Sequence, residues 1–240
     1  MAMSEHTAKA FDVDLQEIAR LVAEMGGLAE KQVADAIDGL ARRDTDRAQQ
    51  TVSSDVAIDA LQREIEEKAV LTIARRQPMA VDLQEIIGAL RVANDLERIG
   101  DLAKNIGKRV LALNSEFHPP KLIRGVEHMG ALVLGQLKEV LDAYGGHDLK
   151  KALAVWNGDE AVDAMCTSLF RELLTYMMED PRNITFCIHL MFCAKNIERM
   201  GDHATNIAET VHFMIEGHEI ADQRPKGDTT TSFATLAAEN

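Results

Sequence analysis

Two short motifs in this sequence each place a glutamate and an aspartate four residues apart. The first joins Glu97 to Asp101 and the second joins Glu198 to Asp202, with a glycine directly before the aspartate in both. On a helix, residues at this spacing project from one face, so each motif presents two carboxylates side by side. Crowded carboxylates repel one another unless a cation lies between them, and the motifs therefore predict cation binding.

An acidic pair upstream of each motif shows that a longer segment is duplicated. Asp55 and Asp59 stand 104 positions before Asp159 and Asp163, whereas the two glutamates of the motifs are 101 positions apart. A shorter turn in the second half accounts for the difference of three residues. The chain therefore consists of two tandem units of about one hundred residues, within the usual size of a domain.

The apolar residues recur with a helical period, and the composition, with only 4% aromatics, suits helices. We predict an all-α fold, a tandem repeat of two three-helix bundles, because short turns force sequential helices to lie side by side. Asp44 is the expected N-cap of the second helix, and Gly145 and Gly146 are expected to separate the fourth helix from the fifth. The predicted bundles span residues 11–114 and 119–217, followed by a mobile tail at 221–240, and the six long helices lie at about 15–40, 45–74, 81–113, 122–144, 148–178 and 183–216.

The second and third helices of each unit run antiparallel about a turn, which contains Pro78 in the first unit and Pro181 in the second. The two acidic pairs of a unit then fall at similar heights on neighbouring helices and can converge. We predict two metal sites, with ligands Asp55, Asp59, Glu97 and Asp101 in the first and Asp159, Asp163, Glu198 and Asp202 in the second. Asn105, Asn206 and His203 are further candidate ligands.

Oxygen ligands favour hard cations such as Mg²⁺, Ca²⁺ or Mn²⁺, and iron also occurs in carboxylate-rich sites. The alternative to metal binding is an exposed acidic helix face balanced by Arg98 and Arg199. Gly100 and Gly201 either let a neighbouring helix come close or leave room for ions, and these two interpretations are compatible.

Charge and cysteine content exclude other classes of protein. A net charge of −13 argues against general nucleic-acid binding. No apolar run is long enough to span a membrane and the N-terminus lacks a signal pattern, so we expect a cytoplasmic protein. The three cysteines, Cys166, Cys187 and Cys193, have no CxxC spacing and lie among apolar residues, which predicts buried free thiols.

At the doubled acidic motifs the chain resembles the PhoU family of phosphate-specific transport system accessory proteins. The resemblance covers about residues 11–217 and includes the segment from Gln77 to Leu83 that leads into the third helix. It implies a cytoplasmic negative regulator of the phosphate-starvation response and of phosphate uptake, often a homodimer. The implied partners are the phosphate ABC transporter ATPase and a membrane sensor histidine kinase.

The resemblance also implies metal ions at the matching acidic residues, as multinuclear iron or zinc clusters in some members and as magnesium in others. This sequence departs from an equal repeat at two positions: Asn196 stands where the first unit has Asp95, and His203 stands where it has Leu102. These differences put equal occupancy of the two sites in doubt.

Competing functions have weaker support in the sequence. A ferritin-like di-iron protein needs paired ExxH motifs, but the chain offers only Glu209 with His212, and the first unit has Lys108 and Leu111 there. The sequence lacks the usual signatures of a hydrolase, since it has neither a GxSxG sequence nor a phosphate-binding glycine loop. We therefore expect a binding protein and not an enzyme, and a scaffold without metal remains the other alternative.

Overall fold

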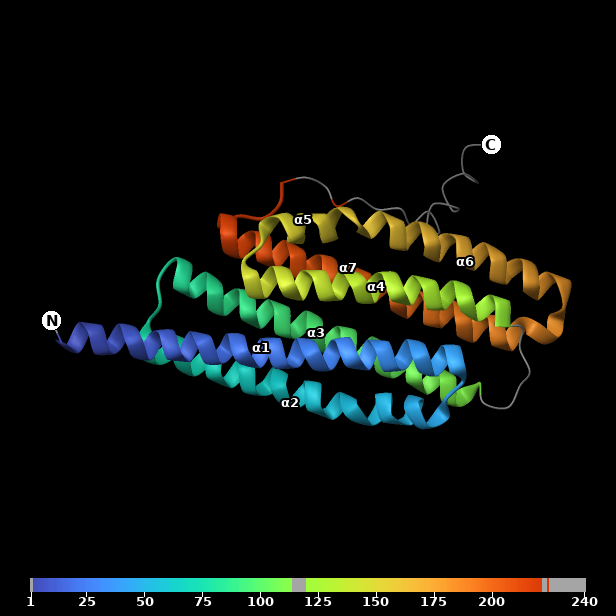
Figure 1. The fold of residues 1–240 in the computed structure, drawn as a ribbon, viewed down its shortest axis with the longest axis horizontal. Coiled ribbons are helices and arrows are strands. Elements are labelled where there is room, and N and C mark those ends of the chain that lie inside the picture. The colour runs from blue at the N-terminus through green and yellow to red at the C-terminus, as the bar shows by residue number, and fades with distance from the viewer. Residues whose placement is uncertain (1, 114–119, 222–223, 225–240) are drawn as a thin grey trace, which may run out of the picture.

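The computed structural model describes residues 2–113, 120–221 and 224, and every regular element in these ranges is helical (Figure 1). The predicted all-α fold with six long helices is confirmed. The elements are α1 (Ala2–Arg42), α2 (Thr45–Arg76), α3 (Val81–Ala112), α4 (Pro120–Gly146), α5 (Leu149–Asn157), α6 (Asp159–Glu179), the 3₁₀ turn η1 (Pro181–Asn183) and α7 (Ile184–Glu216).

The predicted fifth helix is interrupted at Gly158, which separates α5 from α6. The backbone N–H of Gly158 bonds to the carbonyls of Ala154 and Val155 and ends α5 there. Glycine is a poor helix former, and here it also lets the Gln136 amide of α4 approach to 3.2 Å from the position of a Cβ. The interruption places Asp159 in the first turn of α6, where a negative charge is favourable.

Local signals at the helix ends give one confirmation and one correction. Asp44 caps α2 as predicted, with its side chain accepting a hydrogen bond from the backbone N–H of Arg47. The prediction that Gly145 and Gly146 separate two helices is wrong, because both belong to the end of α4. The chain turns instead at His147, whose φ is +49°, and Asp148 then caps α5.

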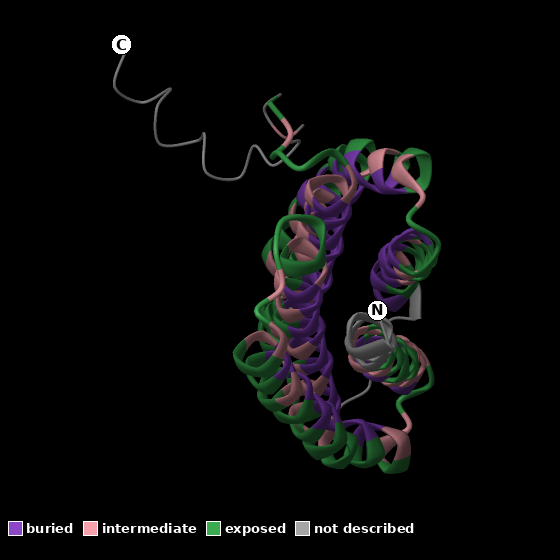
Figure 2. Ribbon diagram, turned by 90° about the vertical axis from the view of Figure 1, so that its left-hand side faces the viewer, coloured by how far each residue is buried: buried purple, intermediate pink, exposed green. Residues whose placement is uncertain are grey.

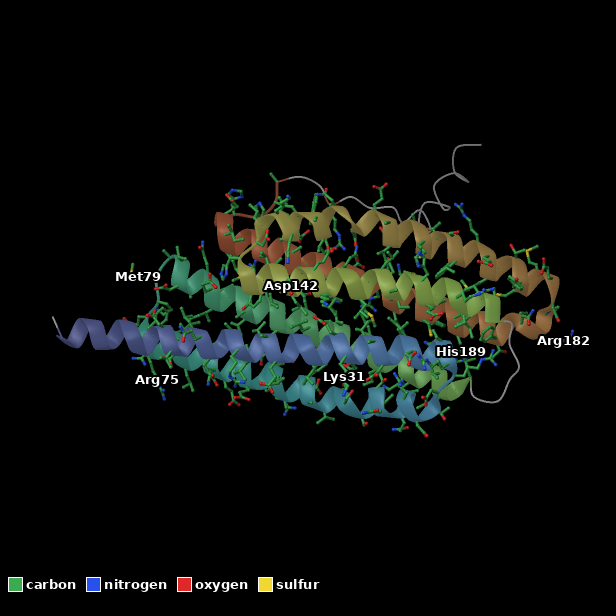
Figure 3. All side chains as sticks on the ribbon, viewed as in Figure 1. Lys31, Arg75, Met79, Asp142, Arg182 and His189 are labelled. Carbon is green, nitrogen blue, oxygen red and sulfur yellow. The ribbon has the colours of Figure 1, made fainter. Side chains whose placement is uncertain are left out.

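The two halves pack in an antiparallel, pseudo-twofold arrangement in which α1 lies along α4 and α3 lies along α7 (Figure 1). The turn at Met79 and the turn at Arg182 therefore lie at opposite ends of the long molecule (Figure 3). Two equivalent contacts mark the crossing of α1 and α4. A Cβ at Gly26 would lie 2.9 Å from Leu141, and a Cβ at Gly130 would lie 2.6 Å from Ile37.

The buried side chains form one continuous apolar cluster that runs through both halves. In Figure 2 the buried parts of the helices face inwards across both repeats and the exposed parts face outwards. The two repeats are thus not independent bundles, since α3 and α7 fill the space between them. The domain boundaries at 11–114 and 119–217 stay predictions. Of the predicted tail at 221–240, only Ala221 and Arg224 belong to the described residues.

All three cysteines are buried and none of them forms a disulfide, as predicted. Burial raises the pKa of the Cys187 thiol and raises that of Cys193 to about 12. In the described part of the chain, no helix is both long and apolar enough to cross a membrane.

We expect a methyl group at the α1–α4 crossing to destabilise the fold. Gly130→Ala must displace Ile37, whereas Gly135→Ala in the same helix meets no atom within 4 Å. Both substitutions gain helix propensity, so their difference isolates the crowding, which costs about 1–3 kcal/mol. Urea unfolding should show Gly130→Ala to be less stable than Gly135→Ala by that amount. Equal stabilities would contradict the close crossing.

We also expect the thiols to resist alkylation in the folded protein. Because burial raises the pKa of Cys193 to about 12, little thiolate forms between pH 7 and 9, and labelling of the folded protein should be slow and should require unfolding. In denaturant, where the thiol pKa returns to about 8.5, labelling should become fast and rise with pH. Mass spectrometry of timed iodoacetamide reactions measures both. Rapid labelling of the native protein would disprove the burial.

Candidate metal centre

Helices α2 and α3 bring the four predicted ligands of the first unit together. Asp55 is 5% exposed, and its carboxylate and that of Asp101 both accept hydrogen bonds from the ammonium of Lys104. Burial raises the pKa of Glu97, and the negative charges of Asp101, Asp59 and Asp55 raise it further, although Arg98 opposes them. Glu97 therefore interacts electrostatically with all three of the other carboxylates. We call these four residues the first acidic cluster.

Helices α6 and α7 build the equivalent second acidic cluster, which lies deeper in the protein. Asp159, Asp163 and Glu198 are only 2%, 4% and 6% exposed. Burial is the largest cause that raises the pKa of Glu198, and the charges of Asp202 and Asp163 add to it, against a lowering hydrogen bond from Lys195. In each cluster the last aspartate, Asp101 or Asp202, keeps about a third of its side chain exposed and connects the site to solvent.

A basic side chain bridges two aspartates in each cluster. Lys104 joins Asp55 to Asp101, and Arg224 joins Asp159 to Asp202 at 2.9 Å and 2.7 Å. Burial lowers the pKa of both bases, but their hydrogen bonds to the aspartates outweigh this effect and the pKa of each is raised. Both bases thus remain positively charged, and they partly neutralise the clusters.

Several buried oxygens in the clusters nevertheless have no hydrogen-bond donor. Lys195 donates to Oε1 of Glu198 at 2.7 Å, but Oε2 of the same carboxylate has no donor. In the first cluster Oε2 of Glu97 lacks a hydrogen bond as well, although Nε of Arg98 lies 3.4 Å away. A buried acceptor without a partner costs about 1–3 kcal/mol, and more when it is charged. A bound cation would satisfy these oxygens.

The structure adds one residue per unit that the sequence analysis missed. Gln32 of α1, only 2% exposed, donates its amide N–H to Asp55 at 3.4 Å, and its Oε1 has no donor. Gln136 of α4 also has a buried Oε1 without a donor. These glutamines are 104 positions apart, the same offset as the upstream aspartates, so the repeat itself contained the signal.

The first motif glycine gives such an amide oxygen room. A Cβ at Gly100 would lie 3.0 Å from Oε1 of Gln32 and 3.6 Å from Oδ1 of Asp55. At Gly201 the corresponding distance to Oε1 of Gln136 is 3.6 Å, an ordinary van der Waals contact. Gly100 therefore serves close packing against α1, whereas the position of Gly201 has space for a methyl group.

The donor set suits a hard cation, since it consists of carboxylate and amide oxygens, some of them buried without a partner. No three or more Asp, Glu, His or Cys side chains within the described ranges are arranged so that they could hold one ion. The aspartates instead form ion pairs with Lys104 and Arg224. The assignment of the eight carboxylates as metal ligands stays a prediction.

The three additional candidates lie around the clusters. Asn105 is exposed on α3. The imidazole Nδ1 of His203 lies 2.8 Å from Asp95 on the facing helix, and Asn206 donates to the same carboxylate at 3.2 Å. Asn206 also lies near the second cluster, because its Oδ1 accepts from Arg224 at 3.5 Å. His203 and Asn206 thus join α7 to α3.

The residues of the lone ExxH sequence have other partners. Glu209 accepts a hydrogen bond from the indole N–H of Trp156, and Nδ1 of His212 lies 3.1 Å from the backbone oxygen of His218. The arrangement gives the ferritin-like alternative no support.

Comparison with known proteins identifies the family to which this duplicated acidic architecture belongs. The family model described as the PhoU domain matches twice, at residues 22–110 and 126–211. The chain belongs to the PhoU family. Both matches contain an upstream aspartate pair and an ExxxD motif, so each PhoU domain carries one acidic cluster.

Named relatives match this chain over almost its full length. A protein of Rhizobium meliloti called a phosphate-specific transport system accessory protein PhoU homolog is 54% identical over 96% of this chain and 98% of its own. A Caulobacter vibrioides protein of the same name is 54% identical over 94% of this chain and 98% of its own.

Two crystal structures have the same fold. PhoU from Pseudomonas aeruginosa superposes with a TM-score of 0.84 at 40% identity and covers 87% of this chain and 100% of its own. The phosphate transport system regulatory protein PhoU from Streptococcus pneumoniae gives a TM-score of 0.81 at 27% identity, with coverage of 88% and 100%.

We expect Glu198→Gln to stabilise the metal-free protein at neutral pH. The substitution removes a buried negative charge whose Oε2 has no donor and which Asp163 and Asp202 repel. The expected gain in the free energy of unfolding is on the order of 1 kcal/mol, after loss of the bond from the half-exposed Lys195. Urea unfolding in chelator measures it, with the exposed, mid-helix Glu139→Gln in α4 as the control of equal charge change. A Glu198→Gln variant no more stable than this control would show that the cluster is not under electrostatic strain.

Proposed function

We propose that this protein is an accessory regulator of a phosphate-specific transport system, which represses phosphate uptake and the phosphate-starvation response while phosphate is plentiful. The observation that carries the proposal is the near full-length similarity, at 54% identity, to a protein named as an accessory of that transport system. The match of the PhoU domain to both halves supports it.

In this proposal the protein acts by binding other proteins at the cytoplasmic side of the membrane. Its partners are the ATPase of the phosphate transporter and a sensor histidine kinase, and it acts as a homodimer. Two features support a binding role: the long helices offer extended outer faces (Figure 1), and the residues of interest are carboxylates paired with basic side chains. Docking to a transporter that lies in the membrane would give a peripheral location through protein partners.

Metal ions form part of the proposal. The first acidic cluster would hold one site, aided by the amide oxygen of Gln32, and the second cluster the other, aided by Gln136. A bound divalent cation supplies positive charge that cancels the repulsion among the carboxylates and fixes their side chains. The carboxylates themselves bind and orient the cation, and the partly exposed Asp101 and Asp202 present each site to a partner.

The regulatory role is tested by deleting the gene and growing the cells in phosphate-rich medium. We expect starvation-induced genes to stay on, at several times their repressed level, and the wild-type gene to restore repression. A variant with Asp55, Asp59, Glu97 and Asp101 changed to their amides should contain less metal, retain less of the ATPase in a pull-down, and repress poorly.

Glu66→Gln with Glu67→Gln, an exposed acidic pair on α2, serves as the control for altered surface charge. Normal repression in the deletion strain would overturn the proposed regulator. Full repression by the folded amide variant, with its lower metal content, would show instead that the first site does not contribute to repression.

A further inference from the structure

The two acidic clusters obtain their bridging cation from different parts of the chain. In the first, Lys104 belongs to α3 itself, one turn beyond Asp101, and is fixed beside its carboxylates by the helix. The matching position in the second repeat, 101 residues later, is Thr205. The hydroxyl of Thr205 donates to Oδ1 of Asp159 at 3.2 Å but brings no charge.

Arg224 supplies the missing charge from outside the repeat. It lies eight positions after Glu216, the last residue of α7, and only 16% of its side chain is exposed. Its Nε donates to Asp159, one terminal nitrogen donates to Asp202 and the other to Asn206, at 2.9, 2.7 and 3.5 Å. The guanidinium thus bridges the aspartates that are equivalent, in the repeat, to those that Lys104 bridges in the first cluster.

Polar groups of the second cluster remain unsatisfied with Arg224 in place. Among the residues that the structure describes, Arg224 pairs with Asp159 and Asp202, and the half-exposed Lys195 pairs with Glu198. Oε2 of Glu198, a residue that is 6% exposed, still has no donor. This unpartnered oxygen is an independent sign that the site accepts a further cation.

A metal ion and Arg224 compete for the same oxygen atoms. An ion bound between Asp159 and Asp202 would need the lone pairs that now accept from the guanidinium, and it would repel that positive charge. We propose that Arg224 is a displaceable counter-ion of the second acidic cluster, so that binding of a divalent cation there releases Arg224 from Asp159 and Asp202. This inference rests on the metal sites of the proposed function.

Such a coupling is reciprocal and specific to one half of the molecule. The factor by which Arg224 weakens cation binding equals the factor by which the cation weakens the docking of Arg224. Lys104 remains attached to α3 beside its cluster whether or not a metal is bound. The second cluster can therefore report its occupancy through the position of Arg224.

The test titrates Mn²⁺ into the full chain by calorimetry, in a Glu97→Gln, Asp101→Asn background in which the first cluster is disabled. We expect Arg224→Gln to bind Mn²⁺ about tenfold more tightly than the parent, within the 5- to 150-fold range of typical couplings. Arg224→Lys should keep most of the parent's affinity. Arg182→Gln, an exposed arginine at the α6–α7 turn, makes the same charge change and should leave the affinity unaltered.

Thermal melting gives a second readout that does not depend on the titration. In chelator, Arg224→Gln should melt at a lower temperature than the parent, because Asp159 and Asp202 lose their ion pairs with the guanidinium. Saturating Mn²⁺ should abolish the difference. Equal Mn²⁺ affinities of the parent and Arg224→Gln would overturn the displacement and leave the metal site standing. Absence of binding in both would overturn this inference together with the metal part of the proposed function, whereas the regulator itself is tested separately in the deletion strain.

Discussion

Electrostatic repulsion among four carboxylates in each half of the molecule is the constraint around which this structure is organised. The antiparallel pairs α2–α3 and α6–α7 bring these carboxylates together, and three of the four residues of the second cluster are buried. The charge is tolerated because Lys104 and Arg224 each bridge two aspartates and remain protonated there. Compensation is incomplete, since one oxygen of Glu97 and one of Glu198 lack donors.

The repeat makes the two clusters equivalent in position, but their bridging positive charges come from different parts of the sequence. Where the first unit has Lys104 the second has Thr205, and the positive charge comes instead from Arg224 beyond the last helix. A duplicated domain needs only a few such substitutions to give one site a permanent counter-ion and the other a removable one. The two halves of a symmetric fold can in this way carry different roles.

The interface between the halves carries short polar contacts beside the second cluster. Nδ1 of His203 lies 2.8 Å from Asp95 of α3, and Asn206, which donates to the same carboxylate, accepts a hydrogen bond from Arg224. The apolar core is continuous across the same interface, and close-packed cores transmit strain. The second cluster is thus joined to the first half of the molecule by contacts that two independent bundles would lack.

The sequence alone determined the repeat, the helices and the residues that gather in each cluster. These depend on local spacing: four residues along a helix place Glu97 beside Asp101, and a turn near Pro78 returns the chain to the height of Asp55. Capping by Asp44 was likewise readable, because a cap is an interaction between near neighbours. The interruption at Gly158 and the turn at His147 were not, since helix propensity is a weak guide when tertiary packing decides.

Tertiary structure alone decided which side chains meet between elements distant in sequence. It merged the two bundles into one core, brought Gln32 to Asp55, and set His203 against Asp95 across the interface. It also carried Arg224 back over sixty-five positions to Asp159. The reason is that periodicity fixes the face of a helix from which a residue projects, whereas the partner it meets depends on how the helices pack and on where the chain returns.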